Sequence, residues 1–182
     1  MNKFLLHHKY DYRIYIIEQA DDMLFNRGAL INVGVAMVDA KYYAAHDVDL
    51  LPGVDVYQFP DSPVCLADAL QRDGFRSQAE LKRRYFRYGG VNLFTKEQFN
   101  KIGGFPWGYF GWGQEDDAFR ERTRKAGFKI SRRPGLFSEL AHKSMRGTKA
   151  KRDKAASCET WEAVGIIEEY AKNTSLIKVC FG

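Results

Sequence analysis

The chain has 182 residues, of which 45% are hydrophobic and 14% aromatic. This length and composition suit a single domain with a sizeable core, over residues 1–182. No apolar run approaches the roughly 18 to 20 residues of a membrane-spanning helix, so we expect no membrane span in this chain. The first residues also lack the pattern of a signal peptide, and as written the sequence predicts a soluble, cytoplasmic protein.

The net charge of +5 raises the question of a polyanionic partner. Much of the excess lies in residues 82–84 and in residues 143–156, which we interpret as a basic, mobile lid. An ordinary basic surface explains the charge as well as a patch for phosphate groups does. Nucleic acid is the third alternative, but no recognised nucleic-acid-binding motif accompanies the charge, so we expect no such partner.

The first half of the chain contains the patterns of two strands and a helix. Residues 12–18 alternate and are rich in β-branched and aromatic side chains, which predicts a strand. Apolar residues at helical spacing predict a helix over 25–38, and a short apolar run predicts a buried strand over 42–45. Three prolines and several aspartates predict a loop over 52–63.

The second half continues the alternation of strands and helices. Residues 89–94 predict a strand whose two glycines mark a close approach to the backbone. Thr95 and Gln98 have the spacing of a capping box, which starts a helix, and a loop rich in glycine and aromatic residues follows over 103–113. The remaining predictions are a helix over 116–126 that stops at Gly127, a short strand over 128–131, a helix over 161–171 and a strand over 176–181. This alternation predicts an α/β sandwich with a central, mostly parallel sheet.

Two carboxylates, Asp47 and Asp49, follow directly after the predicted strand 42–45. In open α/β sheets, ligands collect at the carboxyl ends of strands. Strand alternation would direct both carboxylates to the same side, where they repel each other unless a cation neutralises them. A divalent metal bound to phosphate oxygens suits such ligands. A helix cap or a turn is the alternative, because both often contain Asp-x-Asp.

A second candidate group lies in residues 111–117. Glu115, Asp116 and Asp117 open a helix, where the helix dipole favours anions, and this structural role explains one or two of them. It does not explain Trp112, which stands between two glycines directly ahead. An indole offers a flat apolar face suited to a sugar ring, and a neighbouring carboxylate can remove a proton from a sugar hydroxyl.

Two histidines are candidates for a nitrogen ligand. His142 would complete a metal site begun by Asp49, although a lone histidine is more often structural or simply exposed. His46 is a rival because it adjoins the acidic pair, but strand alternation should direct its side chain to the opposite face.

Five motifs occur in the order and spacing of one known family. They are FNRGALINVG (25–34), HDVDLLP (46–52), YGGVNLFTKEQF (88–99), GGFP (103–106) and GWGQEDD (111–117). On these motifs, and over residues 12–142, the chain resembles the β-1,4-galactosyltransferase family, and within it the xylosylprotein branch. Five ordered motifs together are far more specific than any one of them.

The resemblance implies a nucleotide-sugar-binding fold of the GT-A type. It also implies an inverting, Mn²⁺-dependent transfer of a sugar, galactose first, from a UDP-sugar to a hydroxyl of a carbohydrate acceptor. Asp116 would be the catalytic base, and Asp49 and His142 would ligate Mn²⁺, with Glu139 or Leu140 beside them. The donor-binding residues would be Phe25, Asn26, Arg27, Asp47, Val48, Asp49, Arg87, Gly90 and Trp112. The acceptor-binding residues would be Trp112, Gln114, Glu115, Asp116 and Asp117.

The sequence departs from the family pattern in three places. The family's first strand, which ends in a segment that contacts the nucleotide, has no counterpart here. The alternative function is therefore a catalytically impaired module that binds UDP or sugar. Arg87 stands where the family usually has tyrosine, which leaves the donor sugar open. The family's membrane anchor is also missing, and a fragment of an animal-type enzyme would belong in the Golgi lumen.

Overall fold

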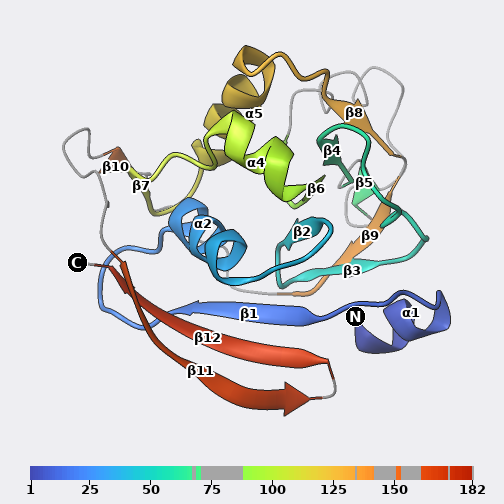
Figure 1. Ribbon diagram of the computed structural model, residues 1–182, viewed down its shortest axis with the longest axis horizontal. Helices are drawn as coiled ribbons and strands as arrows, with labels where there is room; N and C mark the ends of the chain where they lie inside the picture. Colours follow the sequence, from blue (N-terminus) through green and yellow to red (C-terminus); the bar gives the residue numbers. More distant parts are fainter. Residues whose placement is uncertain are drawn as a thin grey trace. The chain divides into compact units, whose positions relative to one another are not determined.

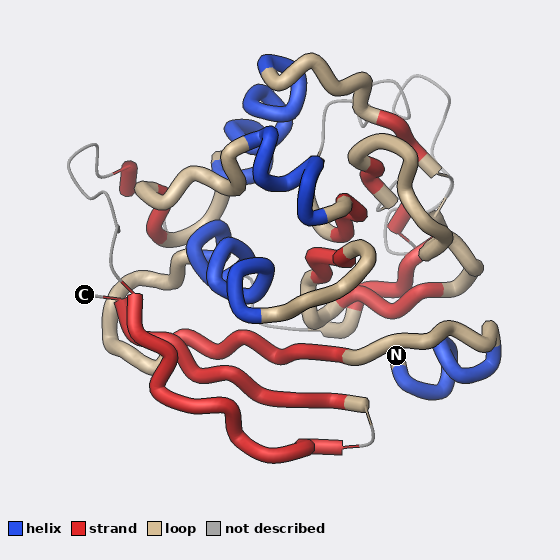
Figure 2. The backbone as a smooth tube through the Cα atoms, viewed as in Figure 1, coloured by secondary structure: helices blue, strands red, loops and turns tan. Residues whose placement is uncertain are grey.

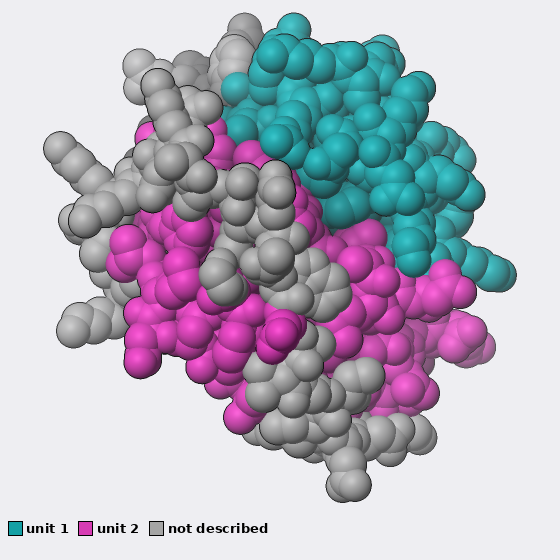
Figure 3. Space-filling view, turned by 60° about the vertical axis from the view of Figure 1, so that its left-hand side comes forward, with its two compact units in different colours: residues 1, 40–104, 116–144 teal, residues 2–39, 105–115, 145–182 magenta. Residues whose placement is uncertain are grey.

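The computed structural model describes residues 1–66, 69–70, 88–133, 135–141, 151–152, 161–171 and 173–181 (Figure 1). The chain divides into two compact units, which Figure 3 shows in different colours. Unit 1 comprises residues 1, 40–104 and 116–144, and unit 2 comprises residues 2–39, 105–115 and 145–182. Such a division is compatible with one folded domain, so the single domain over 1–182 stays a prediction.

Unit 2 is built on a three-stranded sheet with the strand order β1-β12-β11. Strand β1 (Ile14–Gln19) pairs in parallel with β12 (Thr174–Phe181), and β12 pairs antiparallel with β11 (Trp161–Ala171). The three strands lie side by side in Figure 2. Helix α1 (Asn2–His7) precedes β1 and helix α2 (Arg27–Met37) follows it. A short pair, β7 (Tyr109–Phe110) with β10 (Lys151–Arg152), also belongs to this unit.

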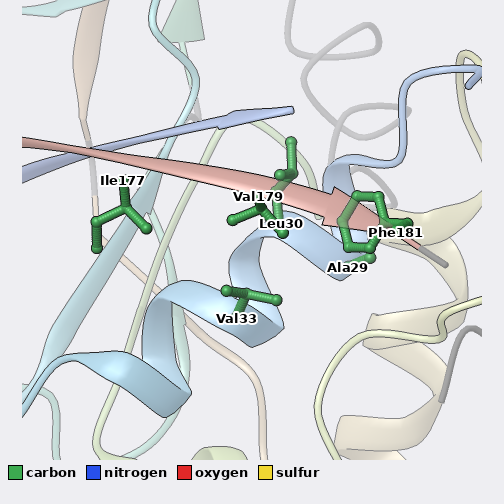
Figure 4. Packing of buried hydrophobic residues seen from close by; sticks show 6 residues of the cluster. All are labelled: Ala29, Leu30, Val33, Ile177, Val179 and Phe181. Carbon is green, nitrogen blue, oxygen red and sulfur yellow. The ribbon is translucent and has the colours of Figure 1, made fainter. Parts of the chain in front are cut away.

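The core of unit 2 joins α2 to β12 (Figure 4). Apolar side chains on one face of the helix meet side chains that alternate along the strand. The buried cluster consists of Ala29, Leu30, Val33, Ile177, Val179 and Phe181. Burial of each larger apolar side chain stabilises the fold by about 1.5–3 kcal/mol. This packing fixes the N-terminal end of α2, where three predicted donor-binding residues lie.

The described strands of unit 1 form two small mixed sheets. The first has the order β2-β6-β4-β8, with β2 (Tyr43–His46), β4 (Val64–Cys65), β6 (Val91–Phe94) and β8 (Ser131–Arg132). The second has the order β3-β9-β5, with β3 (Leu50–Pro52), β5 (Ala69–Leu70) and β9 (Leu136–Glu139). Helix α4 (Lys96–Ile102) follows β6, and helix α5 (Glu115–Lys125) belongs to this unit except for its first residue.

Aromatic packing holds helices α4 and α5 on strand β6. Phe94 of β6, Phe99 of α4 and Phe119 of α5 are buried. The ring centroid of Phe94 lies 4.7 Å from that of Phe99 and 6.0 Å from that of Phe119. Aromatic pairs at such distances add to the stability that burial alone provides. This packing holds the start of α5, which carries the predicted catalytic base Asp116, close to β6, the strand that follows Gly89 and Gly90.

Most of the predicted elements are present. The strands predicted over 12–18, 42–45, 89–94 and 176–181 correspond to β1, β2, β6 and β12, and the helices over 25–38 and 116–126 correspond to α2 and α5. The capping box also forms, because Thr95 Oγ1 accepts from the amide of Gln98 at 3.1 Å and Gln98 Oε1 accepts from the amide of Thr95 at 3.0 Å. The strand predicted over 128–131 begins later, as β8.

The helix predicted over 161–171 is wrong, because this segment is strand β11. Its antiparallel register with β12 shifts twice, between Ala163 and Gly165 and between Ile167 and Ala171. Each irregularity inserts residues into one strand and breaks the alternation of side chains that identifies a strand in the sequence. Pairing with a distant strand outweighs the helix propensity of the alanine and glutamate residues.

The sheets are mixed, which corrects the prediction of a mostly parallel sheet. Among the described strand pairs, β1/β12, β4/β8 and β5/β9 are parallel, and five other pairs are antiparallel. A parallel pair needs a crossover connection of a dozen or more residues. Strands β11 and β12 are separated by only two residues, 172 and 173, so they can pair only in the antiparallel sense.

Candidate active site

The acidic pair that follows β2 lies in a tight turn of unit 1. The carbonyl of Asp47 accepts a hydrogen bond from the amide of Leu50 at 3.2 Å, which closes a β-turn over these four residues. The amide of Asp47 donates to the carbonyl of Gly90 at 2.9 Å and attaches the turn to the residue before β6. Val48 is 88% exposed, while Asp47 and Asp49 are half-buried. Turn geometry therefore presents the two carboxylates, and the strand alternation that we expected does not extend to them.

The far end of this turn is attached to strand β9. Leu50 lies opposite Glu139 in the antiparallel pair β3/β9, and the amide of Leu140 donates to the carbonyl of Asp49 at 2.7 Å. His142, the predicted nitrogen ligand, comes two residues later and lies outside the described residues. Within the part of the chain that is described, no group of three or more His, Cys, Asp or Glu side chains could hold a metal ion. The ligand pair Asp49 and His142 stays a prediction.

His46, the rival ligand, is engaged inside unit 1. Its Nδ1 lies 2.7 Å from the carbonyl oxygen of Asp47, and its Nε2 lies 2.8 Å from the hydroxyl of Tyr57. Burial lowers the pKa of His46, although the hydrogen bond and the charge of Asp47 act in the opposite direction. Both ring nitrogens therefore have partners within the protein, and in this arrangement neither is directed at a metal ion.

The predicted catalytic base packs against the two glycines that precede β6. A Cβ placed on Gly89 would collide with Oδ2 of Asp116 and would lie 3.0 Å from its Cγ. The carboxylate of Asp116 thus lies directly over the backbone of Gly89, a close approach that fits the glycines in this motif. Because Gly90 accepts the amide of Asp47, the acidic turn and Asp116 lie beside the same pair of glycines.

Trp112 lies in a loop of unit 2 with unusual backbone angles. Gly111 and Gly113 on either side have φ values of 86° and 97°, and Gln114 has a φ of 75°, which is uncommon for a residue other than glycine. The Trp112 side chain is 54% exposed. The amide of Gly111 donates to the carbonyl of Phe25 at 2.8 Å, and β7, just before this loop, pairs with β10 of the basic segment. The N-terminal end of the loop is therefore fixed, and its indole is exposed.

Asn26 holds the start of helix α2. Its side chain is fully buried, with Oδ1 accepting from the amide of Ala29 at 3.0 Å and Nδ2 donating to the carbonyl of Trp107 at 2.6 Å. It is therefore the N-cap of the helix and ties it to the segment before β7. Because both polar atoms of its side chain are used in this way, Asn26 would contribute to nucleotide binding only by positioning the neighbouring residues.

Arg27 and Glu115 form an ion pair in unit 2. Arg27 Nη1 lies 3.8 Å from Glu115 Oε1, and the Arg27 guanidinium lies 5.8 Å from the centre of the Phe105 ring. Both side chains of the pair are largely buried, whereas Phe25 is 49% exposed. The structure thus brings together one predicted donor-binding residue, Arg27, and one predicted acceptor-binding residue, Glu115.

Two family models match the sequence. One, described as the N-terminal region of glycosyl transferase group 7, matches residues 1–60, and the other, described as the N-terminal domain of galactosyltransferase, matches residues 72–145. The β-1,4-galactosyltransferase 3 of Cricetulus griseus is 39% identical to the chain over 157 residues. The chain belongs to the β-1,4-galactosyltransferase family. That alignment includes 81% of this chain but only 38% of the relative, so the chain spans about two fifths of the length of such relatives.

Solved structures of the family share the fold. The catalytic domain of Drosophila β1,4-galactosyltransferase 7, in complex with xylobiose, matches with a TM-score of 0.78 and 26% identity, over 100% of this chain and 85% of that one. A mutant of the same enzyme, in complex with manganese, UDP-Gal and xylobiose, matches with a TM-score of 0.76 and 25% identity over the same shares. The GT-A class predicted from the motifs is therefore confirmed. Among the described helices, none is both long and apolar enough to cross a membrane.

The predicted site residues of this chain stay predictions. Arg87 lies outside the described residues. Asp117 is an exposed residue of α5 whose carboxylate lies 3.6 Å from Arg120. Tyr57 lies in the loop over 52–63, where no periodic pattern surrounds it, so no sequence signal singles it out. Gly89 belongs to the motif over 88–99, but its contact with Asp116 is visible only in the fold.

Proposed function

We propose that this chain is a Mn²⁺-dependent inverting transferase that moves galactose from UDP-galactose to a hydroxyl of a carbohydrate acceptor. The observation that carries the proposal is the position of the Asp116 carboxylate on Gly89, beside the acidic turn that Gly90 holds. Family membership supports the reaction class. The Drosophila complex with manganese, UDP-Gal and xylobiose supports a sugar nucleotide as donor and a xylose-containing sugar as acceptor.

The residues at the acidic turn fit a divalent metal ion. Asp49 supplies a carboxylate on a turn whose backbone is fixed by Leu140, and His142 would supply an imidazole. Carboxylate oxygen together with imidazole nitrogen suits Mn²⁺. When bound there with the donor, Mn²⁺ would act as a Lewis acid that stabilises the negative charge on the departing UDP. Asp47 and Val48 would lie along the nucleotide.

Asp116 would act as the general base. Its carboxylate accepts the proton of the acceptor hydroxyl as that oxygen attacks the anomeric carbon of the donor. The bond between the anomeric carbon and the UDP oxygen breaks, and UDP leaves with the bonding electrons. Attack from the face opposite UDP inverts the anomeric centre in a single displacement. Trp112 offers an exposed indole face on which a sugar ring can pack.

The substitution Asp116→Asn tests the proposed base. It should lower the transfer rate by about 10²–10⁴-fold, the usual contribution of a general base, while UDP binding in the presence of Mn²⁺ stays unchanged. Product formation by chromatography and UDP binding by calorimetry measure the two effects. The control is Glu121→Gln, which changes an exposed carboxylate of the same helix that is not among the predicted site residues.

The two assays also separate catalysis from binding alone. A rate loss below about tenfold in Asp116→Asn would contradict the role of this residue as base. If the wild-type chain binds UDP and Mn²⁺ but forms no product with any sugar acceptor, it is a binding module and the transferase proposal fails.

A further inference from the structure

The carbonyl of Asp47 is the point where the acidic turn is closed. It accepts from the amide of Leu50 at 3.2 Å across the turn, and His46 Nδ1 lies 2.7 Å from the same oxygen. This second contact is the shorter of the two. The side chain of the residue just before the turn therefore contacts the oxygen on which the turn depends.

The partners of the ring decide which nitrogen of His46 carries hydrogen. A carbonyl oxygen can only accept, so Nδ1 must be the donor to Asp47. In a neutral imidazole Nε2 is then an acceptor, and the Tyr57 hydroxyl at 2.8 Å donates to it. Tyr57 thus favours the tautomer that keeps the N–H on Nδ1 and directed at the Asp47 carbonyl.

Packing fixes the plane of the ring. The His46 ring stacks on that of Tyr57, with centroids 6.1 Å apart and planes at 24°, and Phe137 meets it edge-on at 6.0 Å. Tyr57 and Phe137 are both buried, and Phe137 belongs to β9, the strand that also leads to the Leu140 amide on Asp49. The same strand therefore supports the histidine and the far end of the turn.

We propose that His46, oriented by Tyr57, is a positioning residue that holds the acidic turn in the shape in which Asp49 binds the metal. The proposal rests on the proposed function in one respect, the role of Asp49. The geometric part, that the Nδ1–H of His46 stabilises the turn at Asp47, stands on the hydrogen bonds alone. The two parts can be tested separately.

Exchange of the Leu50 amide hydrogen, followed by NMR, reports directly on the turn. His46→Phe keeps a planar ring but has no N–H, and Leu50 should then exchange about three- to tenfold faster, because one hydrogen bond is lost. His46→Asn places an amide N–H near the position of Nδ1 and should restore protection to within about twofold of wild type. His46→Gln places its amide near the position of Nε2 and should not restore it. The amide of Phe99, bonded to Thr95 in helix α4, is the control and should not change.

Mn²⁺ affinity in the presence of UDP, measured by EPR of the free ion, tests the link to the site. Loss of such a supporting contact typically costs about 10–100-fold in metal affinity. We expect a loss in this range in His46→Phe and recovery in His46→Asn, with kcat at saturating Mn²⁺ changing less than the KM for Mn²⁺. Equal Leu50 exchange in the Asn and Phe variants would overturn the role of Nδ1. Faster exchange with wild-type Mn²⁺ affinity would overturn the link to the metal.

The wild-type protein separates the failure of this inference from that of the proposed function. If it shows no UDP-dependent Mn²⁺ binding, the proposed function fails, while the exchange pattern still decides whether His46 holds the turn. If His46→Phe does not fold, the Asn and Gln variants supply the same comparison. Equal exchange in those two variants would then contradict the proposal.

Discussion

At the scale of single residues, the contact between Gly89 and Asp116 has the clearest consequence. A methyl group on Gly89 would occupy the position of the Asp116 carboxylate. That carboxylate is the end of a flexible side chain, so it can move away at little cost in stability. A displacement of about 1 Å at a reacting group is enough to lower a rate by about 10²-fold. The same methyl group should therefore affect the rate far more than the fold.

We expect Gly89→Ala to lower kcat by about 100-fold while the melting temperature and the KM for UDP-galactose stay close to wild type. Steady-state kinetics and thermal unfolding measure these quantities. The matched control is Gly53→Ala in the same unit, where the nearest neighbouring atom to a new Cβ is the Leu136 carbonyl oxygen, at 3.3 Å. A Gly89→Ala variant with wild-type kcat would show that the position of Asp116 on Gly89 is unimportant for the reaction.

Sequence patterns point to candidate site residues but do not report their geometry. Asp47 and Asp49 stand out as an acidic pair, yet the bond between Asp47 and Leu50 that turns the chain is not visible in the pattern. The support of this turn by His46 and Tyr57 involves a loop residue eleven positions away. Such contacts arise only when the two segments fold against each other, and no local periodicity reports them.

At the scale of elements, Asp21 joins the end of strand β1 to the end of strand β12. Its Oδ2 accepts from the amide of Phe181 at 2.8 Å, and its Oδ1 accepts from Gln19 Nε2 at 2.7 Å and from the amide of Met23 at 3.0 Å. Burial opposes the charged form, but these three bonds outweigh it and lower the pKa of Asp21. The carboxylate therefore stabilises the fold at a pH above the unfolded-state pKa of about 4, and this contribution is lost as the pH falls through the lower pKa of the folded state.

We expect Asp21→Asn to lower the free energy of unfolding by about 1 kcal/mol at neutral pH, because the amide cannot accept at both oxygen positions. The difference from wild type should shrink as the pH falls below the ordinary aspartate pKa of about 4, because the wild-type carboxyl then becomes protonated as well. Urea unfolding at several pH values measures this difference in unfolding free energy. The control is Asp22→Asn, which changes the exposed neighbouring residue. An unfolding free energy difference that is independent of pH would contradict this assignment.

Helices and strands that depend on contacts between nearby residues could be predicted from the sequence, and those that depend on contacts with distant segments could not. Helix α4 was predictable because Thr95 and Gln98, three residues apart, form its cap. Strand β11 was not, because its partner β12 and the two register shifts determine its conformation. Strands β3 and β9 gave no signal because each is short and pairs with a segment far along the chain.

At the scale of the whole molecule, the family and fold class were within reach of the sequence, because five short motifs keep their order over most of the chain. The orientation of the strands was not, since the sheets mix parallel and antiparallel pairs that depend on connections between distant segments. In unit 1, the structure adds that the acidic turn and Asp116 lie beside the same two glycines. A donor held at the turn would therefore lie close to the base that serves the acceptor.

The most direct test of the account is the anomeric configuration of the product formed from UDP-galactose, in which galactose is α-linked. The chain, UDP-galactose and a panel of acceptors that includes xylobiose are incubated with Mn²⁺ or with EDTA, and the product is analysed by NMR. We expect a β-linked galactoside with Mn²⁺ and no transfer with EDTA. An α-linked product, or transfer that continues undiminished in EDTA, would contradict it.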